Sequence, residues 1–210
     1  LLPDTKISNS DMSSFESDQK AEQPFIETSI PEPGNEMGNN PEVLTNPVKV
    51  KLEDPSSDLM NIPTRILIPA IGLDAAVVPA KLLKVKVNGY LFDQWSAPDQ
   101  YAAGWHPTSS GLGQIGNTVL NGHHNDHGEV FRKLIDLQPG DVIMVFSGQN
   151  LHSYSITNIM TLQEVGVPLE QRMLNSRWIA PSTDERLTLV TCWPYESNTH
   201  RLVIVAKPAQ

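Results

Sequence analysis

From Thr64 onward the chain alternates between short apolar runs and turn residues. Seven runs are predicted to be β-strands, and six of them are rich in Val, Ile, Leu or Thr and bounded by Gly, Pro, Asn or Asp. The runs are 64–69, 75–87, 117–122, 141–147, 151–162, 186–192 and 201–206. Because only "GQN" separates the fourth from the fifth, these two are predicted to pair as a hairpin.

Two further stretches have helical patterns. In "GEVFRKLIDL" (128–137) the apolar positions from Val130 to Leu137 recur at helical spacing, and "PLEQRMLNS" (168–176) begins with a proline, as many helices do. Many short strands with one or two short helices predict an all-β fold, either a barrel or a sandwich.

The first 60 residues differ in composition from the rest of the chain. Of 24 acidic and 15 basic residues, they hold 12 and 4, so they carry −8 of the net charge of −9. They also contain 7 of the 17 prolines, and Phe15 and Phe25 are their only aromatic residues. Such a segment buries little apolar surface to offset the entropy of ordering. We therefore predict an acidic disordered linker over 1–60 and one folded domain over 61–210.

Composition argues against several classes of function. No basic stripe is present, which argues against a nucleic-acid partner. No run of about 18 apolar residues occurs, so no segment of this sequence is predicted to span a membrane. Cys192 is the only cysteine, which excludes an intramolecular disulfide and a cysteine-rich zinc site. A lone cysteine is more often a small buried apolar residue than a nucleophile, so its neighbours must decide.

The neighbours of Cys192 suggest a reactive thiol. The run 186–192 ends at Cys192, and the next run begins at Arg201. If the two runs pair as an antiparallel hairpin, Cys192 and Arg201 lie opposite each other at the mouth of an eight-residue loop, with Cβ atoms about 4.5–5.5 Å apart. The guanidinium would then favour the thiolate and stabilise an oxyanion. The alternative is a solvated arginine at a strand edge.

A thiol nucleophile also needs a proton acceptor, for which histidine is the usual side chain. His123 follows the strand 117–122, so it lies at a strand end as Cys192 does. His124 and His127 lie further along the same loop, and His200 precedes Arg201. Each of these can also be an ordinary surface or turn histidine.

Three motifs together resemble the sortase family over residues 64–207. They are "TLVTC" (188–192), "VLNGHHNDHGEVFRKLIDLQPGD" (119–141) and the arginine in "THRLVIVAKP" (199–208). The resemblance implies a closed eight-stranded β-barrel. It also implies that Cys192 is the nucleophile, His123 the acid/base and Arg201 the group that stabilises the oxyanion. The pairing of Gly122 with His123 favours His123 over His124.

The resemblance implies a cysteine transpeptidase on the extracellular face of the bacterial membrane. Such an enzyme cleaves an LPXTG-like sorting motif in a secreted protein and transfers it to an amine on a cell-wall precursor or a pilin. It needs no cofactor and no metal, and an N-terminal segment outside this sequence would anchor it. The subfamily stays open among classes C, D, E and F. The aromatic lid of class C would fall on "EDPSSD" (53–58), where Ser56 occupies the aromatic position.

Two other readings compete with this one. Within "HHNDH" (123–127), His124, Asp126 and His127 match the second half of a zinc-hydrolase motif, although Gly122 stands where the first half needs histidine. A non-enzymatic β-barrel that binds a partner and buries its thiol would also fit the composition. Neither reading accounts for the three motifs in order.

Overall fold

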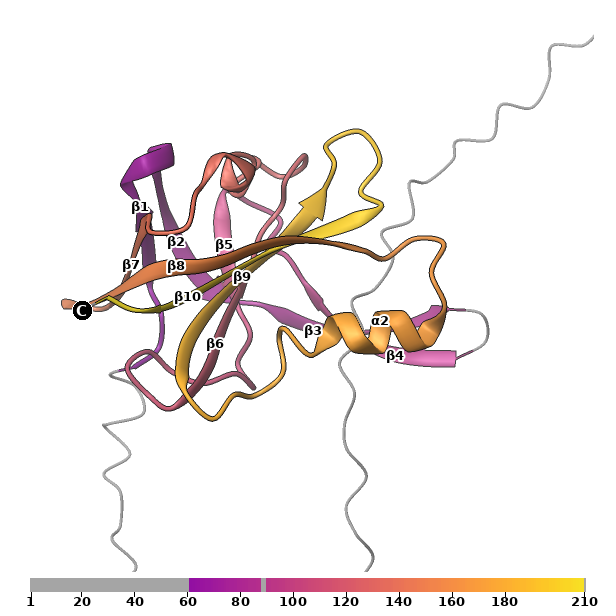
Figure 1. Ribbon diagram of the computed structural model, residues 1–210, viewed down its shortest axis with the longest axis horizontal. Coiled ribbons are helices and arrows are strands. Elements are labelled where there is room, and N and C mark those ends of the chain that lie inside the picture. The colour runs from indigo at the N-terminus through magenta and orange to yellow at the C-terminus, as the bar shows by residue number, and fades with distance from the viewer. Residues whose placement is uncertain (1–60, 88–89, 210) are drawn as a thin grey trace, which may run out of the picture.

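Eight strands close into a barrel in the computed structural model, which describes residues 61–87 and 90–209 (Figure 1). This confirms the all-β, eight-stranded prediction. The predicted linker 1–60, and within it the stretch 53–58 that was compared with the class C lid, lie outside the described residues. Around the barrel the strands are β1 (Arg65–Ile68), β2 (Leu73–Pro79), β5 (Ala102–Trp105), β6 (Gly116–Asn121), β9 (Glu185–Trp193), β10 (His200–Pro208), β8 (Asn150–Gln163) and β7 (Val142–Ser147), which pairs with β1.

All seven predicted runs contain strands, but the run 75–87 is divided. Its first half belongs to β2, and its second half is β3 (Lys81–Val87), which pairs antiparallel with β4 (Tyr90–Ser96) as a separate two-stranded sheet. The sequence did not predict β4 or β5. In β5 the letters "AAGW" carry little strand propensity, and parallel pairing with β2 and burial of the two alanines hold the segment extended.

One of the two helix predictions is confirmed. Residues 168–176 form α2 (Leu169–Ser176), whereas 128–137 contain only turns and the 3₁₀ turn η2 (Leu134–Asp136). A second 3₁₀ turn, η1, spans Pro69–Ile71. His127, Gly128 and Glu129 have positive φ, which prevents a helix from starting there. The helical spacing in 128–137 arises because its apolar side chains all pack into the barrel core.

The barrel interior is filled by alternate side chains of the strands. Ile66 and Ile68 of β1, and Leu187 and Leu189 of β9, are fully buried, so successive inward positions are two residues apart. Phe131 joins this core from the loop after β6. The side chains that fill the core therefore come from one face of each strand.

Strand direction brings distant parts of the chain to one edge of the barrel. Most neighbouring strands are antiparallel, but β6 and β9 run parallel, with Asn121 opposite Val190. The C-terminal ends of both strands, and the segments that follow them, therefore lie side by side.

In the part of the chain that the structure describes, no helix has the length and apolar character needed to cross a membrane.

Candidate active site

Cys192 and Arg201 lie directly opposite each other on β9 and β10. The two strands are antiparallel, and their register pairs these two residues, as the sequence predicted. Arg201 is 6% exposed, and its Nη1 donates to the backbone carbonyls of Asn198 at 3.3 Å and His200 at 3.2 Å. These two bonds hold the guanidinium at the start of β10, the strand end that pairs with Cys192.

His123 reaches the same place from β6. It lies two residues after Asn121, and Cys192 lies two residues after Val190, which pairs with Asn121. Beyond the strand pairing, the Gly122 N–H donates to the Val190 carbonyl at 3.2 Å, and the Thr191 hydroxyl donates to the Gly122 carbonyl at 2.7 Å. The side chain of Thr191, the residue before Cys192, thus links its own strand to the backbone beside His123.

Gly122 is needed because the chain passes too close to its neighbours for a side chain. A Cβ at this position would lie 2.7 Å from side-chain atoms of both Val130 and Phe131. The Phe131 N–H in turn donates to the His123 carbonyl at 2.9 Å. The Gly-His pair and the phenylalanine that follows it therefore position His123 through packing.

Cys192, His123 and Arg201 line one cleft that is partly open to solvent. His123 is 9% exposed, and the thiol is half-buried. The cleft walls include Trp95 from β4 and Ile179 from the segment after α2. The structure thus brings together all three candidates, each from a different strand end.

The loop between β9 and β10 is held against the loop that follows His123. The Asn125 side-chain amide donates to the Tyr195 carbonyl, and Asn198 Nδ2 donates to Asn125 Oδ1 at 3.3 Å. The Tyr195 hydroxyl donates to Glu129, which lowers the pKa of the Glu129 carboxyl and raises that of Tyr195. These contacts hold the loop that follows His123 in a fixed position relative to the loop that precedes Arg201.

His124 has a different environment from His123. Its ring packs edge-on against Trp193 and Tyr195, with centroids 5.3 and 5.6 Å away, and it is 2% exposed. Burial lowers its pKa, which favours the neutral imidazole. The contacts of His124 are therefore those of a packing residue at the base of the β9–β10 loop.

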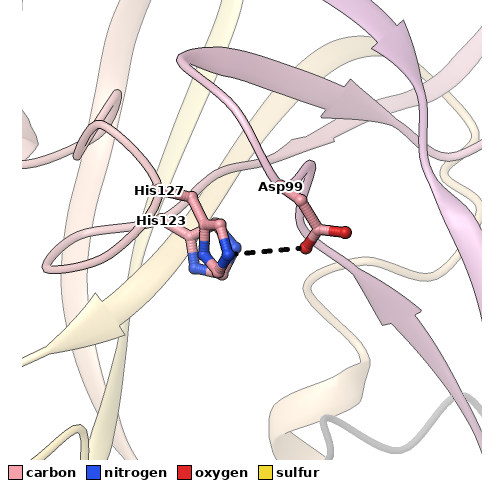
Figure 2. A group of neighbouring side chains, drawn as sticks. All are labelled: Asp99, His123 and His127. Carbon is pink, nitrogen blue, oxygen red and sulfur yellow. Dashed lines mark ion pairs between the residues drawn. The ribbon is translucent and has the colours of Figure 1, made fainter.

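The zinc hypothesis grouped His124, Asp126 and His127, but the structure assembles a different set. Ligand atoms of Asp99, His123 and His127 lie within 4.8 Å of one another (Figure 2). The His123 and His127 rings are 4.8 Å apart between centroids. The predicted motif is therefore not a ligand set, since His124 is directed at Trp193 and Tyr195.

Sequence reasoning missed the cleft residues supplied by β4 and by the segment after α2. The ring of Trp95 stacks on His106 at 4.9 Å between centroids and 22° between planes. Ile179 follows α2, which is fixed to the end of β8 by a buried ion pair of 3.1 Å between Arg172 and Glu164. The only signal in the sequence was Trp95, in a stretch that was not predicted to be a strand.

His106 is expected to make the protein sensitive to acid. Burial lowers the pKa of His106 from 6.5 to about 3, so the native state keeps it neutral while the unfolded chain protonates it. Its contribution to stability is therefore complete above pH 6.5 and is lost as the pH falls toward 3, by at most about 1.4 kcal/mol per pH unit. Urea unfolding at pH 7 and pH 4.5 should show a smaller loss for His106→Phe than for the parent protein. An equal loss in both proteins would contradict this.

Two known proteins are similar to this chain in sequence. Sortase A of Listeria monocytogenes is 28% identical over 135 residues, which is 64% of this chain and 57% of that protein. Sortase SrtE1 of Streptomyces coelicolor is 32% identical over 97 residues, or 45% of this chain and 27% of that protein. The chain thus matches little more than half the length of the first relative and about a quarter of the second.

The fold is also that of solved sortases. The crystal structure of sortase E1 from Streptomyces coelicolor with a tripeptide in the active site has a TM-score of 0.51 at 21% identity, over 72% of this chain and 90% of that one. The family model described as "Sortase domain" matches residues 66–209, more than two thirds of the chain. On this match, the chain belongs to the sortase family.

Proposed function

We propose that this protein is a cysteine transpeptidase with Cys192 as nucleophile, His123 as acid/base and Arg201 as oxyanion-stabilising group. The observation that carries the proposal is the register of β9 and β10, which places the thiol and the guanidinium opposite each other in a cleft that His123 also lines. A strand-edge arginine would be solvated, but Arg201 is 6% exposed and held by two carbonyls.

The proposed chemistry has two acyl transfers. The sulfur of Cys192 attacks a peptide carbonyl, and Arg201 donates hydrogen bonds to the oxyanion of the tetrahedral intermediate. His123, as imidazolium, gives a proton to the leaving amine as the C–N bond breaks and the thioester forms. An incoming amine then attacks the thioester, His123 accepts its proton, and the thiolate leaves.

The substrate is proposed to be a secreted protein with an LPXTG-like sorting motif, and the acceptor an amine of a cell-wall precursor or a pilin. Trp95 and Ile179 give the cleft apolar walls on which an extended peptide can pack. The Streptomyces sortase E1 structure, which shares this fold, contains a tripeptide in its active site. We place the enzyme on the outer face of the membrane, with residues 1–60 as a linker to an anchor and 61–210 as the catalytic domain.

The function can be tested by incubating the protein with a fluorescent sorting peptide and an amine such as triglycine. Mass spectrometry should detect a thioester on the intact protein, followed by the peptide joined to the amine. Cleavage without a thioester, or no reaction with any sorting peptide, would count against the proposal.

Arg201→Lys is expected to lower kcat by about 10²-fold, the usual effect of removing an oxyanion donor. A single ammonium does not reproduce the planar fork of donors with which a guanidinium can hold two carbonyls and still face the cleft. The matched control is Arg65→Lys, because Arg65 forms a solvent-exposed ion pair with Asp74 on the barrel surface. A kcat close to the parental value in Arg201→Lys would contradict the oxyanion-stabilising role of Arg201.

A further inference from the structure

We propose that Asp99, His123 and His127 form a zinc site, and that a Zn²⁺ ion bound there inhibits the enzyme by occupying its acid/base histidine. Two imidazoles and a carboxylate are ligands that zinc prefers, and three protein ligands leave a fourth position for water. One ligand atom from each of the three residues lies within 4.8 Å of the other two. The inhibitory part of the proposal rests on the proposed role of His123.

The spacing of the ligand atoms suits a zinc ion after a small contraction. Zinc lies about 2.0–2.2 Å from nitrogen and oxygen ligands, so two ligands of a tetrahedral ion are about 3.4 Å apart. His127 Nε2 and Asp99 Oδ1 are 3.9 Å apart (Figure 2). Side-chain rotation supplies the difference, because Asp99 is 76% exposed and His127 39% exposed.

A second carboxylate orients His127 for this role. Asp126 Oδ2 lies 3.1 Å from His127 Nδ1, and Asp126 Oδ1 accepts the His127 backbone N–H at 2.8 Å. A proton on Nδ1 shared with Asp126 leaves Nε2, the nitrogen that faces Asp99, available as a ligand. This is the carboxylate–histidine–metal arrangement that raises the basicity of a zinc ligand and fixes its ring.

The backbone around His127 holds its ring beside His123. His127 and Glu129 adopt left-handed backbone conformations with φ of 44° and 57° on either side of Gly128, which non-glycine residues rarely occupy. The His127 ring thereby lies 4.8 Å from that of His123. Asp99 approaches from the segment between β4 and β5, so the site joins two separate loops at the rim of the catalytic cleft.

An ion in this site would compete with catalysis. A nitrogen of His123 that binds zinc has its lone pair in the metal bond, so it neither accepts nor delivers the proton that the leaving and attacking amines require. Inhibition is therefore expected to be reversible, and a chelator should restore the activity. The zinc-hydrolase reading predicts the opposite, since in that case zinc would be required for turnover.

The direct test is calorimetric titration of the full chain with zinc chloride, which needs no enzymatic activity. One ion is expected to bind, and Asp99→Asn or His127→Asn should weaken binding by at least 10-fold. Asp126→Asn should weaken it by about 10- to 100-fold, the usual effect of losing a carboxylate behind a metal-bound histidine. Calcium chloride should give no comparable binding, because calcium prefers oxygen ligands.

Two controls separate this site from other zinc ligands. Cys192→Ala should bind zinc as tightly as the parent protein, whereas a site made of Cys192 and His123 would be lost. His152→Asn removes an imidazole from β8, outside the ligand group, and should also bind normally. Zinc binding that needs Cys192 and survives His127→Asn would overturn the proposal.

Peptide cleavage measured with and without zinc tests the inhibition, with each variant compared with its own metal-free rate. Zinc should inhibit the parent protein, and the inhibitory concentration should rise at least 10-fold in His127→Asn. Zinc that binds at Asp99 and His127 but leaves turnover unchanged, or that activates it, would overturn the inhibitory role. If the metal-free protein cleaves no sorting peptide, the proposed function fails, while the calorimetric result still decides whether the site exists.

Discussion

Cys192→Ala is expected to abolish both cleavage and transfer of a sorting peptide. Cys192 is the only cysteine in the chain, so no other thiol can form the thioester. Removal of a catalytic nucleophile lowers kcat by on the order of 10⁶-fold. Activity should therefore fall to background in a coupled assay, and intact-protein mass spectrometry should show no covalent adduct with the peptide.

The control for this variant is a measurement that shows it is still folded. Cys192 is half-buried at the end of β9, where alanine can take its place in the strand pairing with Arg201, so circular dichroism should match that of the parent protein. In the parent, the thiol should react with a thiol reagent in the folded state, as a structural core thiol would not. Residual turnover in a folded Cys192→Ala protein would refute the nucleophile assignment.

His123→Ala is expected to lower kcat/KM by about 10²- to 10⁴-fold, the range that a general acid–base group contributes. Without His123, the amine leaves the tetrahedral intermediate without the imidazole that shares the cleft with Cys192 and Arg201. His124→Ala and His127→Ala are each expected to cost far less activity, and a chelator should not reduce the activity of the parent protein. Added imidazole, which is small enough for the vacated space, should restore part of the rate in His123→Ala.

The matched control for His123 is His152→Ala. His152 lies on β8 ten residues before Leu162, which pairs with Arg201, and is therefore roughly 30 Å along the strand from the cleft. Its removal should leave kcat/KM near the parental value. Equal losses in His123→Ala and His124→Ala, or a loss on chelation that zinc restores, would refute the acid/base assignment.

Many of the barrel strands could be predicted because a buried strand needs apolar residues, and these are visible in the sequence. Short runs rich in Val, Ile and Leu and bounded by turn residues identified β1, β7 and β10 as strands, and "GQN" identified the hairpin of β7 and β8. The apolar pattern gave the wrong secondary structure where a segment is buried without having the composition typical of its element. β5 contains mainly alanine and glycine, and 128–137 has helical spacing because its side chains reach the core from a series of turns.

The sequence by itself determined which side chains are candidates for the site. The position of Cys192 at the end of one strand and Arg201 at the start of the next fixes their pairing, because a hairpin's register follows from local strand and loop lengths. His123 was a candidate for the same reason, as a residue at a strand end. Each of these inferences needed only contacts between neighbouring segments of the chain.

Only the tertiary structure decided which strand ends meet. The parallel pairing of β6 with β9 brings His123 to Cys192, and it joins strands more than 60 residues apart in the sequence. The separate β3–β4 sheet carries Trp95 into the cleft, and the segment between β4 and β5 carries Asp99 to the two histidines. A sequence pattern shows only which face of each strand is buried. It does not predict contacts between distant strands, because these depend on how the complete sheet closes.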